Sequence, residues 1–278
     1  MKVFISADME GATGVTNLED LVQGQPEYSR FRRLMTGDVN AAIQGAFEAG
    51  ATEVLVNDSH WSMRNVLLEE LDPRAQLISG MRKPLCMMQG VEGADAALFV
   101  GYHSRAGTDK GVFNHTMYGR EIIEVRLNGV PVGETGLNAA IAGAFGIPVV
   151  LVAGDDKVCL EATSLLGRGL ETVAVKEGID RYTAKCLAPA ESQRRIREAT
   201  VRALKRVREA KPYRLEGPVT IEVDFMSTAE SEVGTLIPGV EKIGPRTIRI
   251  VQEDYLTAFK LSLACMILAY SVSDPMYG

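Results

Sequence analysis

Short apolar runs rich in β-branched residues alternate, over the first two thirds of the chain, with longer segments whose apolar residues recur at helical spacing. Several of these runs are apolar throughout, which is typical of strands buried on both faces of a sheet. The predicted strands are 3–7, 53–57, 75–79, 96–102 and 149–153, and the predicted helices are 27–49, 63–71 and 134–145. This alternation predicts an α/β fold with a doubly wound, mostly parallel sheet.

The pattern changes after residue 188. One long segment there keeps apolar residues on one helical face and arginines on the other, and two short β-rich runs and a strongly apolar helix follow it. The predicted elements are a helix over 191–210, strands over 219–224 and 247–251, and a helix from residue 254. We therefore expect an α/β domain over 1–188, which carries the candidate chemistry described below, and a smaller α+β domain over 189–278.

The chain shows no sequence sign of a membrane segment or of export. Its most apolar stretch, 258–269, is shorter than the roughly 20 residues that a bilayer requires and contains Lys260, so we expect a buried core helix. A predicted strand at the very start leaves no place for a signal peptide. Four widely spaced cysteines without a CxxC pair are typical of free thiols in a reducing compartment. These features favour a cytoplasmic protein.

Composition and charge narrow the class of partner. The 278 residues, of which 46% are hydrophobic, are enough to bury a sizeable core. Thirty Lys and Arg against 36 Asp and Glu give a net charge of −6, which argues against nucleic acid or an anionic membrane as the main partner. Eleven of the basic residues fall within 181–215, where we expect a solvated helix face rather than a binding surface. A small molecule or a peptide is the expected substrate.

Candidate metal ligands follow three of the predicted strands. Asp8 and Glu10 come after the first strand, His60 after the second and His103 after a later one. Ligands of doubly wound folds bind outside the carboxyl ends of the strands, so we expect these side chains to converge. If the first strand stays extended, Asp8 and Glu10 project to the same side. A set of carboxylates and imidazoles without thiolate suits Zn²⁺, with Mn²⁺ or Co²⁺ as alternatives, and disfavours Mg²⁺ or Ca²⁺.

Three further residues have two interpretations each. His115 lies in a loop, where it is either a surface histidine or a catalytic base or nucleophile. Glu134 opens a helix, where it is either a first-turn acid favoured by the helix dipole or a fifth metal ligand. Asp58 is interpreted as a turn residue or a support for the ligands. Spacing alone does not choose between these alternatives.

Six short motifs, taken together, resemble the zinc-dependent D-aminopeptidase family of dipeptide-transport operons. They occur in the family's order from residue 1 to about 190, with weaker likeness beyond. The motifs are Ser6-x-Asp8-x-Glu10-Gly11, Asn57-Asp58-Ser59-His60, Gly101-Tyr102-His103, Asn114-His115, Gly133-Glu134-x-Gly136-Leu137-Asn138-Ala139 and Val152-Ala153-Gly154-Asp155-Asp156. Each motif alone is weak, but six in order are specific.

The resemblance implies a dinuclear zinc site and a catalytic histidine, within a two-domain α/β subunit of a ring-shaped homo-oligomer, a decamer. It carries the catalytic role onto His115. It carries the metal ligands onto Asp8, Glu10, His60, His103 and Glu134. The chain departs from the family next to the catalytic position, where Asn114 stands in place of a small hydroxyl residue, and this departure concerns the pocket rather than the chemistry.

The expected activity is that of a dinuclear zinc aminopeptidase, which removes the N-terminal residue from short peptides, with peptides that contain D-amino acids as candidate substrates. Paired metals also hydrolyse other substrates, so a hydrolase of phosphoesters or of other amides is one alternative. A non-catalytic Rossmann-like binding module is the other. Neither has the glycine-rich phosphate cradle that it would use, because the chain lacks GxxxxGK[ST] and its segment 11–14 does not match GxGxxG.

Overall fold

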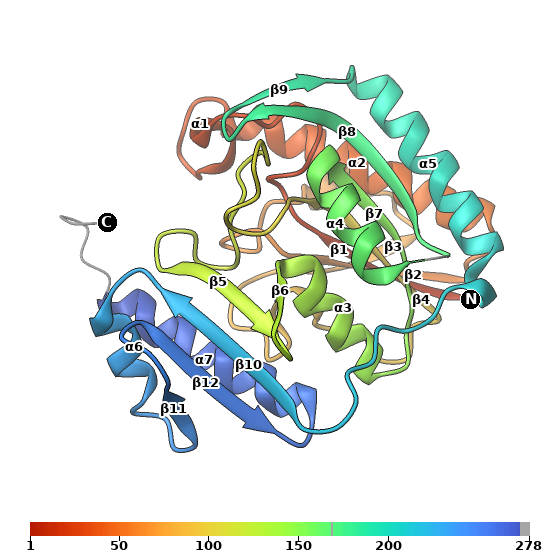
Figure 1. Cartoon of the computed structure of the whole chain (residues 1–278). Helices are drawn as coiled ribbons and strands as arrows, with labels where there is room; N and C mark the ends of the chain where they lie inside the picture. The colour runs from red at the N-terminus through yellow and green to blue at the C-terminus, as the bar shows by residue number, and fades with distance from the viewer. Residues whose placement is uncertain (168, 273–278) are drawn as a thin grey trace.

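The computed structural model describes residues 1–167 and 169–272 and contains two sheets with helices packed around them (Figure 1). Sheet A has seven strands in the order β3-β2-β1-β4-β7-β8-β9, all parallel except β9. Its strands are β3 (Ala75–Ile78), β2 (Glu53–Asp58), β1 (Lys2–Ala7), β4 (Ala96–Tyr102), β7 (Val149–Asp155), β8 (Glu171–Asp180) and β9 (Thr183–Cys186). The predicted α/β class with a mostly parallel sheet is confirmed.

Sheet B is antiparallel and has five strands in the order β11-β12-β10-β5-β6. These strands are β11 (Val240–Lys242), β12 (Thr247–Gln252), β10 (Val219–Phe225), β5 (Ile122–Leu127) and β6 (Val130–Val132). Burial alternates residue by residue along β10, because one face of sheet B packs on helices α6 (Thr228–Gly234) and α7 (Tyr255–Val272) and the other is polar.

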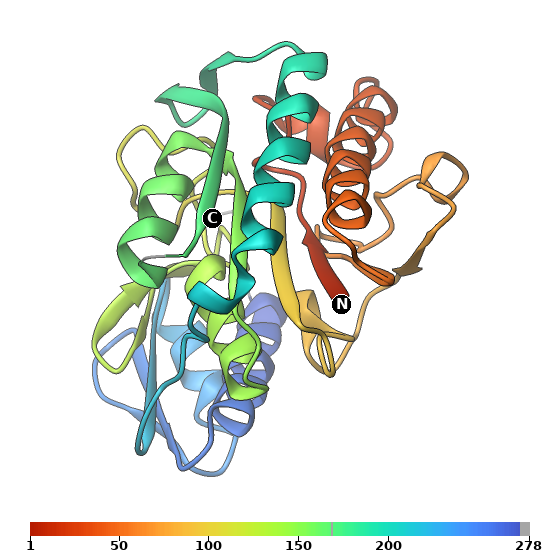
Figure 2. The same ribbon diagram turned by 90° about the vertical axis from the view of Figure 1, so that its right-hand side faces the viewer.

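Helices cover both faces of sheet A. Helices α2 (Tyr28–Glu48) and α5 (Pro189–Lys205) lie side by side on one face, as Figure 2 shows, and helix α3 (Glu134–Ala144) lies on the other, between sheet A and α7. The remaining helices are α1 (Leu18–Leu21), α4 (Asp156–Leu166), which packs on β7 and β8, and the short 3₁₀ segments η1 (Leu68–Glu70), η2 (Cys86–Met88) and η3 (Val207–Glu209). Two buried clusters result, one under α2 and α5 and one shared by sheet A, α3, α7 and sheet B.

The chain passes between the two sheets three times. Strands β1 to β4 belong to sheet A, β5 and β6 to sheet B, β7 to β9 to sheet A, and β10 to β12 to sheet B. Residue 188, the predicted domain boundary, lies at the last of these passages, and α5 beyond it packs on α2. The division at 188 stays a prediction, and we propose that each sheet with its own helices forms one structural unit.

The predicted helix over 63–71 is wrong. Only Leu68–Glu70 forms a single 3₁₀ turn there, and Met63 adopts a left-handed conformation with φ 54°. The carboxylate of Asp58 accepts hydrogen bonds from the amides of Asn65 and Val66, at 2.5 and 2.6 Å. Side-chain acceptance of these amides replaces the helical ladder and fixes a loop instead.

The apolar helix near the C-terminus is longer than expected. Helix α7 has 18 residues, so by length and composition it reaches the threshold for a membrane span, which 258–269 alone does not. Core helices of other proteins pass the same test. Its inner side packs on sheet B and α3, but only 39% of the helix is buried within one chain. An exposed apolar side with Ile267 and Tyr270 therefore remains.

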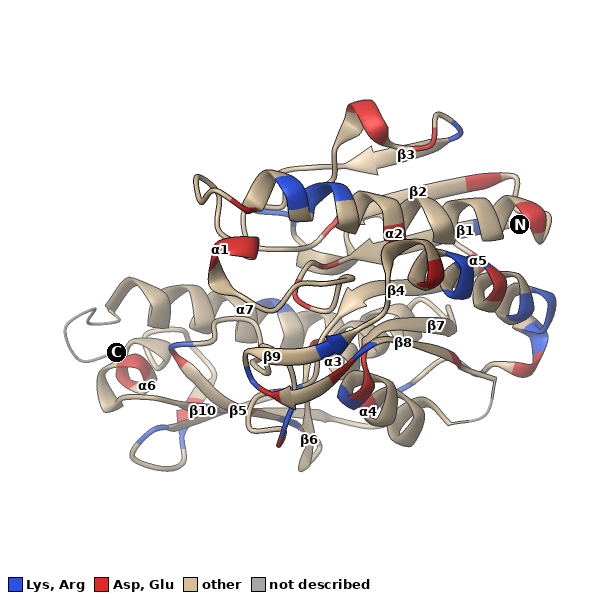
Figure 3. Cartoon of the chain, turned by 90° about the horizontal axis from the view of Figure 1, so that it is seen from above, with Lys and Arg blue, Asp and Glu red and all other residues tan. Residues whose placement is uncertain are grey.

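The basic segment forms an exposed face in which charges of both signs alternate (Figure 3). Arg194 on α5 pairs with Glu191 and Glu198 on the same helix, and Arg202 pairs with Glu171. Such pairs support the interpretation of this segment as a solvated helix face. All four cysteines are free thiols, and only Cys186 is exposed.

Candidate metal centre

The predicted site lies where the strand order of sheet A reverses. Strands β1 and β4 are neighbours and parallel, while the chain continues outward from each in opposite directions. Such a switch point leaves a crevice at the carboxyl ends of the strands. Asp8 follows β1 and His103 follows β4 directly, and His60 comes two residues after β2. All three side chains are buried.

Two glycines allow the ends of β1 and β4 to approach this closely. A Cβ atom on Gly11 would lie 1.7 Å from the carbonyl oxygen of Tyr102, and one on Gly101 would lie 2.0 Å from that of Asp8. Gly101 also has φ +76°, a backbone conformation that residues with a Cβ atom rarely adopt. The segments with Asp8 and His103 therefore meet only because these two positions lack side chains.

The carboxylates of Asp8 and Glu10 converge, although not for the predicted reason. The amide of Asp8 still donates to Val100 in the strand ladder, but the chain then turns, with the amide of Ala12 donating to Met9 at 3.0 Å. Glu10 lies in this turn and not in an extended strand. The expected same-side projection along an extended strand is thus wrong, and the turn brings the second carboxylate to the site.

One half of the cluster joins Asp8, Glu10 and His60. The Nδ1 atom of His60 lies 2.9 Å from Oε2 of Glu10 and 3.7 Å from Oδ1 of Asp8. Its Nε2 atom donates to the carbonyl oxygen of Leu21 at 3.3 Å. In a neutral ring this bond leaves a lone pair on Nδ1, directed at the two carboxylates.

The other half joins Asp8, His103 and Glu134. The Nε2 atom of His103 lies 3.5 Å from Oδ2 of Asp8 and 3.5 Å from Oε1 of Glu134. Its Nδ1 atom donates to the carbonyl oxygen of Ser104 at 3.0 Å. Oδ2 of Asp8 and Nε2 of His103 are buried without any hydrogen-bond partner, and such orphaned polar atoms require an explanation.

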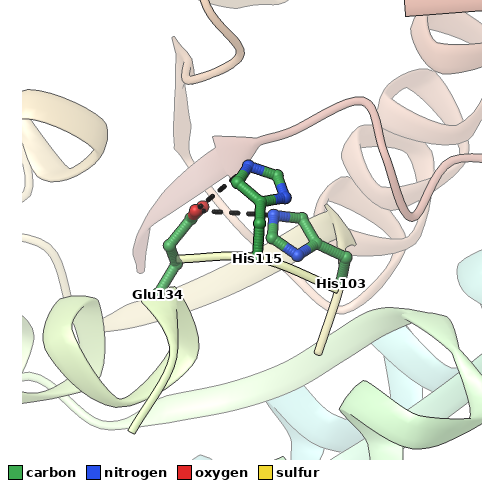
Figure 4. Close-up of side chains that lie close together, drawn as sticks. All are labelled: His103, His115 and Glu134. Atoms are coloured by element: carbon green, nitrogen blue, oxygen red, sulfur yellow. Dashed lines mark ion pairs between the residues drawn. The ribbon is translucent and has the colours of Figure 1, made fainter. Parts of the chain in front are cut away.

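His115 lies against this second half (Figure 4). Its ring stacks on that of His103 with centroids 4.1 Å apart, and its Nε2 atom lies 3.8 Å from Oε1 of Glu134 and 3.9 Å from Oε1 of Glu10. Its Nδ1 atom donates to the carbonyl oxygen of Phe113 at 2.7 Å. The His115 side chain is 17% exposed, more than the other five, and is therefore the most accessible to a substrate.

The electrostatics of the cluster are those of a site with too much negative charge. Burial, and then the neighbouring carboxylate of Glu10, raise the pKa of Asp8 well above its usual value. Burial opposes the charged form of His103, but the carboxylates of Glu134, Asp8 and Glu10 together outweigh it and raise the pKa of His103 to about 10. Burial, and then the stacked His103, lower the pKa of His115. A divalent cation would remove this conflict by neutralising the carboxylates and displacing protons from the rings.

The donor set fits a divalent transition metal. A tetrahedral ion with bonds of about 2 Å places its ligand atoms about 3.3 Å apart, close to the 3.5 Å separations around His103. Among residues 1–167 and 169–272, ligand atoms within 4.8 Å of one another occur in His103, His115 and Glu134, and in Asp8, Glu10 and His103. Oxygen and imidazole donors without thiolate are typical of zinc, manganese or cobalt sites.

Buried or half-buried charged groups outside the cluster anchor the loops that carry it. Asp58 binds the amides of the loop after His60, which supports its interpretation as a turn residue. Glu161 accepts from the amide of Arg105, two residues after His103, and from that of Gly133, which precedes Glu134. Lys176 on β8 is a third anchor, since its ammonium donates to the carbonyls of Glu10, Ala12 and Val15. Glu161 and Lys176 were not predicted, because one lies in a helix and the other in a strand without a local motif.

Comparisons with known proteins agree with this geometry. The family model of peptidase M55, the D-aminopeptidases, matches residues 1–264. A D-aminopeptidase of Bacillus subtilis is 41% identical over 278 residues, which cover 98% of this chain and 99% of that protein. The solved structure of the zinc-dependent D-aminopeptidase DppA of Bacillus subtilis, a self-compartmentalizing protease, superposes with a TM-score of 0.95 at 40% identity, over 99% of this chain and 100% of that one. The chain therefore belongs to the M55 family of D-aminopeptidases, and the metallo-aminopeptidase activity that the sequence predicts is confirmed.

Proposed function

We propose that this enzyme holds two zinc ions per subunit and uses them to remove the N-terminal residue from short peptides. The proposed ligands are Asp8, Glu10, His60, His103 and Glu134. The observation that carries the proposal is the position of Asp8, whose two carboxylate oxygens face different histidines, Oδ1 toward His60 and Oδ2 toward His103. A carboxylate placed in this way is suited to bridge two cations.

The two halves of the cluster supply matching ligand sets. Glu10 and His60 join Oδ1 of Asp8 on one side, and Glu134 and His103 join Oδ2 on the other. Each half thus offers one imidazole, one carboxylate of its own and one oxygen of the shared carboxylate. Three protein donors per ion leave positions open for substrate, as in catalytic rather than structural zinc sites.

Zinc in such a site acts as a Lewis acid on a peptide carbonyl and lowers the pKa of water toward neutrality. In our proposal the chain supplies the proton transfer through His115. Its Nδ1–H is fixed by the carbonyl of Phe113, so the neutral ring keeps a lone pair on Nε2, on the side of Glu10 and Glu134. A group in this state can take a proton from water or attack the carbonyl itself, and both roles remain open.

The proposed substrates are short peptides with a free N-terminus, including those with a D-amino acid. The curated sequence and the solved structure that match nearly the whole chain, at 41% and 40% identity, are both of Bacillus subtilis D-aminopeptidase. The preference for D- or L-residues is set by the shape of the pocket around the α-carbon of the substrate, and in our proposal Asn114, which precedes His115 in the chain, borders that pocket. Its side-chain amide donates to the carbonyl of Thr108, and its oxygen accepts from Arg181, which fixes its orientation.

We further propose that the subunits assemble into a ring-shaped homo-oligomer, a decamer. The DppA relative is a self-compartmentalizing protease. In this chain the exposed apolar side of α7, with Ile267 44% and Tyr270 61% exposed, needs a cover that a second copy can provide. Light scattering on the purified enzyme tests this proposal, with a mass of ten subunits expected and a stable monomer as the contradicting result.

A panel of matched D- and L-aminoacyl peptides tests the activity. The enzyme is stripped with a chelator, assayed, and assayed again after Zn²⁺, Mn²⁺ or Co²⁺ is added. We expect hydrolysis only with added metal and a faster rate for one enantiomer of each pair. Full activity of the stripped enzyme would contradict the role of the metal, and equal rates for both enantiomers would contradict the stereochemical proposal.

A further inference from the structure

A buried lysine that none of the predicted roles uses lies behind the loop that carries Glu10. Lys176 is on β8, and the residue is 1% exposed. Its ammonium group donates to three backbone carbonyls, those of Glu10 at 2.6 Å, Ala12 at 3.0 Å and Val15 at 2.7 Å. An ammonium has three donors, so this one loop segment takes all of them.

A charge in such a place is costly and requires a reason. Burying an ammonium costs several kcal/mol unless a counter-charge or several good hydrogen bonds compensate. Within residues 1–167 and 169–272, no carboxylate forms an ion pair with Lys176. Its direct hydrogen-bond partners are therefore the three carbonyl groups of the segment 10–15, while the carboxylates of Asp155, Asp38 and Glu10 favour its charge from beyond ion-pair distance.

The same segment is held from its amide side by a carboxylate. Asp38 on α2 accepts from the amide of Thr13 at 2.9 Å and from the Thr13 hydroxyl at 3.0 Å. Lys176 and Asp38 thus bind opposite polar groups of one turn, and both are buried. With its backbone held at these points, the turn directs the carboxylate of Glu10 toward His60, 2.9 Å away.

We propose that Lys176 is a positioning residue for Glu10, and that its ammonium holds the carbonyls of the segment 10–15 in the orientation that Glu10 needs to bind metal. The inference rests on the proposed role of Glu10 as a ligand. Supports of this kind, one step behind the ligands, set the affinity of metal sites. A methionine at 176 would fill much of the same volume but would remove the donor to the carbonyls of Glu10 and Val15, and would leave that of Ala12 with only the amide of Val15.

Zinc affinity of the full-length enzyme, measured by competition with a chromophoric chelator, tests the inference. We expect Lys176→Met to weaken zinc binding by about 10- to 100-fold. Lys176→Gln, which keeps two donors without the charge, should weaken it less but measurably. The matched control is Lys185→Met on the adjacent strand β9, where the lysine side chain is 76% exposed and where we expect wild-type affinity.

A double-mutant cycle separates positioning of Glu10 from a general effect on folding. If Lys176 acts through Glu10, Lys176→Met should not weaken zinc binding further in a Glu10→Ala background. Wild-type affinity of both Lys176 variants would overturn the inference, as would an undiminished loss in the Glu10→Ala background. If Lys176→Met does not fold by circular dichroism, Lys176→Gln carries the same comparison. Wild-type affinity of Glu10→Ala itself would instead overturn the proposed metal site.

Discussion

The two sheets of this enzyme differ in how far they are buried and in where their polar residues lie. The central strands of sheet A are buried on both faces, and every residue of β4 and β7 is buried. Sheet B is buried on one face only, so that β10 alternates between apolar residues and the polar residues Thr220, Glu222 and Asp224. The polar groups of sheet A are concentrated beyond its strand ends, whereas those of sheet B are spread along its open face. The polar groups beyond the strand ends of sheet A form the candidate metal centre, whereas those on the open face of sheet B face solvent.

The backbone shows the same difference. All described non-glycine residues with positive φ except Asn128 lie in the connections that follow β2, β3 or β4 of sheet A. Phe113 and Met117 flank His115 in this way, and Trp61 and Met63 follow His60. Such conformations are costly and persist where the surrounding structure enforces them, often at functional sites. In sheet B, Asn128 belongs to an Asn-Gly hairpin turn, where positive φ is normal.

The largest effect is expected from the most accessible member of the cluster. His115→Ala should lower kcat by at least 100-fold, because proton transfer by a positioned side chain contributes about 10²- to 10⁴-fold. Zinc content should stay at the wild-type level, since the five proposed ligands remain. Steady-state kinetics and metal analysis on the same preparation check both parts. Near-wild-type turnover would contradict the catalytic role of His115.

A second effect is expected from an anchor that does not touch the cluster. Glu161→Ala removes the acceptor shared by the amides of Arg105 and Gly133 and so loosens the loops of His103 and Glu134 together. We expect kcat/KM to fall by about 10- to 100-fold. Glu161→Gln, whose amide keeps one acceptor oxygen, should lose less.

The control for Glu161, which lies on α4, is an acid of sheet A away from the carboxyl edge of that sheet. Glu171 opens β8 and binds Arg202 and Arg206 at the surface. Glu171→Ala should leave kcat/KM unchanged. Equal losses in Glu161→Ala and Glu171→Ala would show that the loss of a carboxylate on α4 or β8 has the same effect wherever it lies, and would contradict the anchoring role of Glu161.

One glycine with positive φ in each sheet allows the same substitution to be compared between the two sheets. Gly101 in sheet A and Gly129 in the hairpin of sheet B have φ +76° and +79°, but a Cβ on Gly101 would collide with Asp8, while one on Gly129 has nothing within 4 Å. Gly129→Ala should cost about 1 kcal/mol of stability and leave activity intact. Gly101→Ala should destabilise more and lower zinc affinity, because Asp8 must move. Thermal unfolding measures the loss of stability in each variant, and zinc titration measures its zinc affinity. Wild-type zinc affinity in both variants would contradict the expected difference between the sheets.

The smallest effect is expected on the open face of sheet B. Arg126 binds Glu124, Glu222 and Asp224 there. Arg126→Met should lower the free energy of unfolding by about 1 kcal/mol, the upper range for half-exposed ion pairs, with no change in kcat/KM. A loss of activity would contradict the separation between the two sheets.

The loss of stability in Arg126→Met should depend on pH in a direction that the pKa of Asp224 fixes. Hydrogen bonds from the Arg126 guanidinium hold the pKa of Asp224 below its usual value. The folded-state pKa is thus below the unfolded one, so the stabilisation is fully present above about pH 4 and is lost as the pH falls through the folded-state pKa. Denaturant unfolding of wild type and Arg126→Met should converge at acid pH, and a constant difference would exclude Asp224 as the source.

Much of sheet A could be predicted from the chain, because strands buried on both faces are continuous apolar runs. Sheet B was harder, since β5 and β6 lie far in sequence from β10 and pairing at that distance leaves no local pattern. Their hairpin did carry one signal, Asn128-Gly129. Four of the proposed ligands, Asp8, Glu10, His60 and His103, were predicted from polar residues after strands, and Glu134 was added by the family resemblance. Lys176 and Glu161 were not predicted, because their role depends on which distant amides and carbonyls the fold brings to them.

Anomalous diffraction at the zinc absorption edge tests the central claim most directly. On crystals of the enzyme grown with Zn²⁺, the account predicts two peaks on either side of Asp8, one beside Glu10 and His60 and one beside His103 and Glu134. A single peak would leave an aminopeptidase with one ion and remove the bridging role of Asp8. Peaks only outside this cluster, or none in active crystals, would contradict the account.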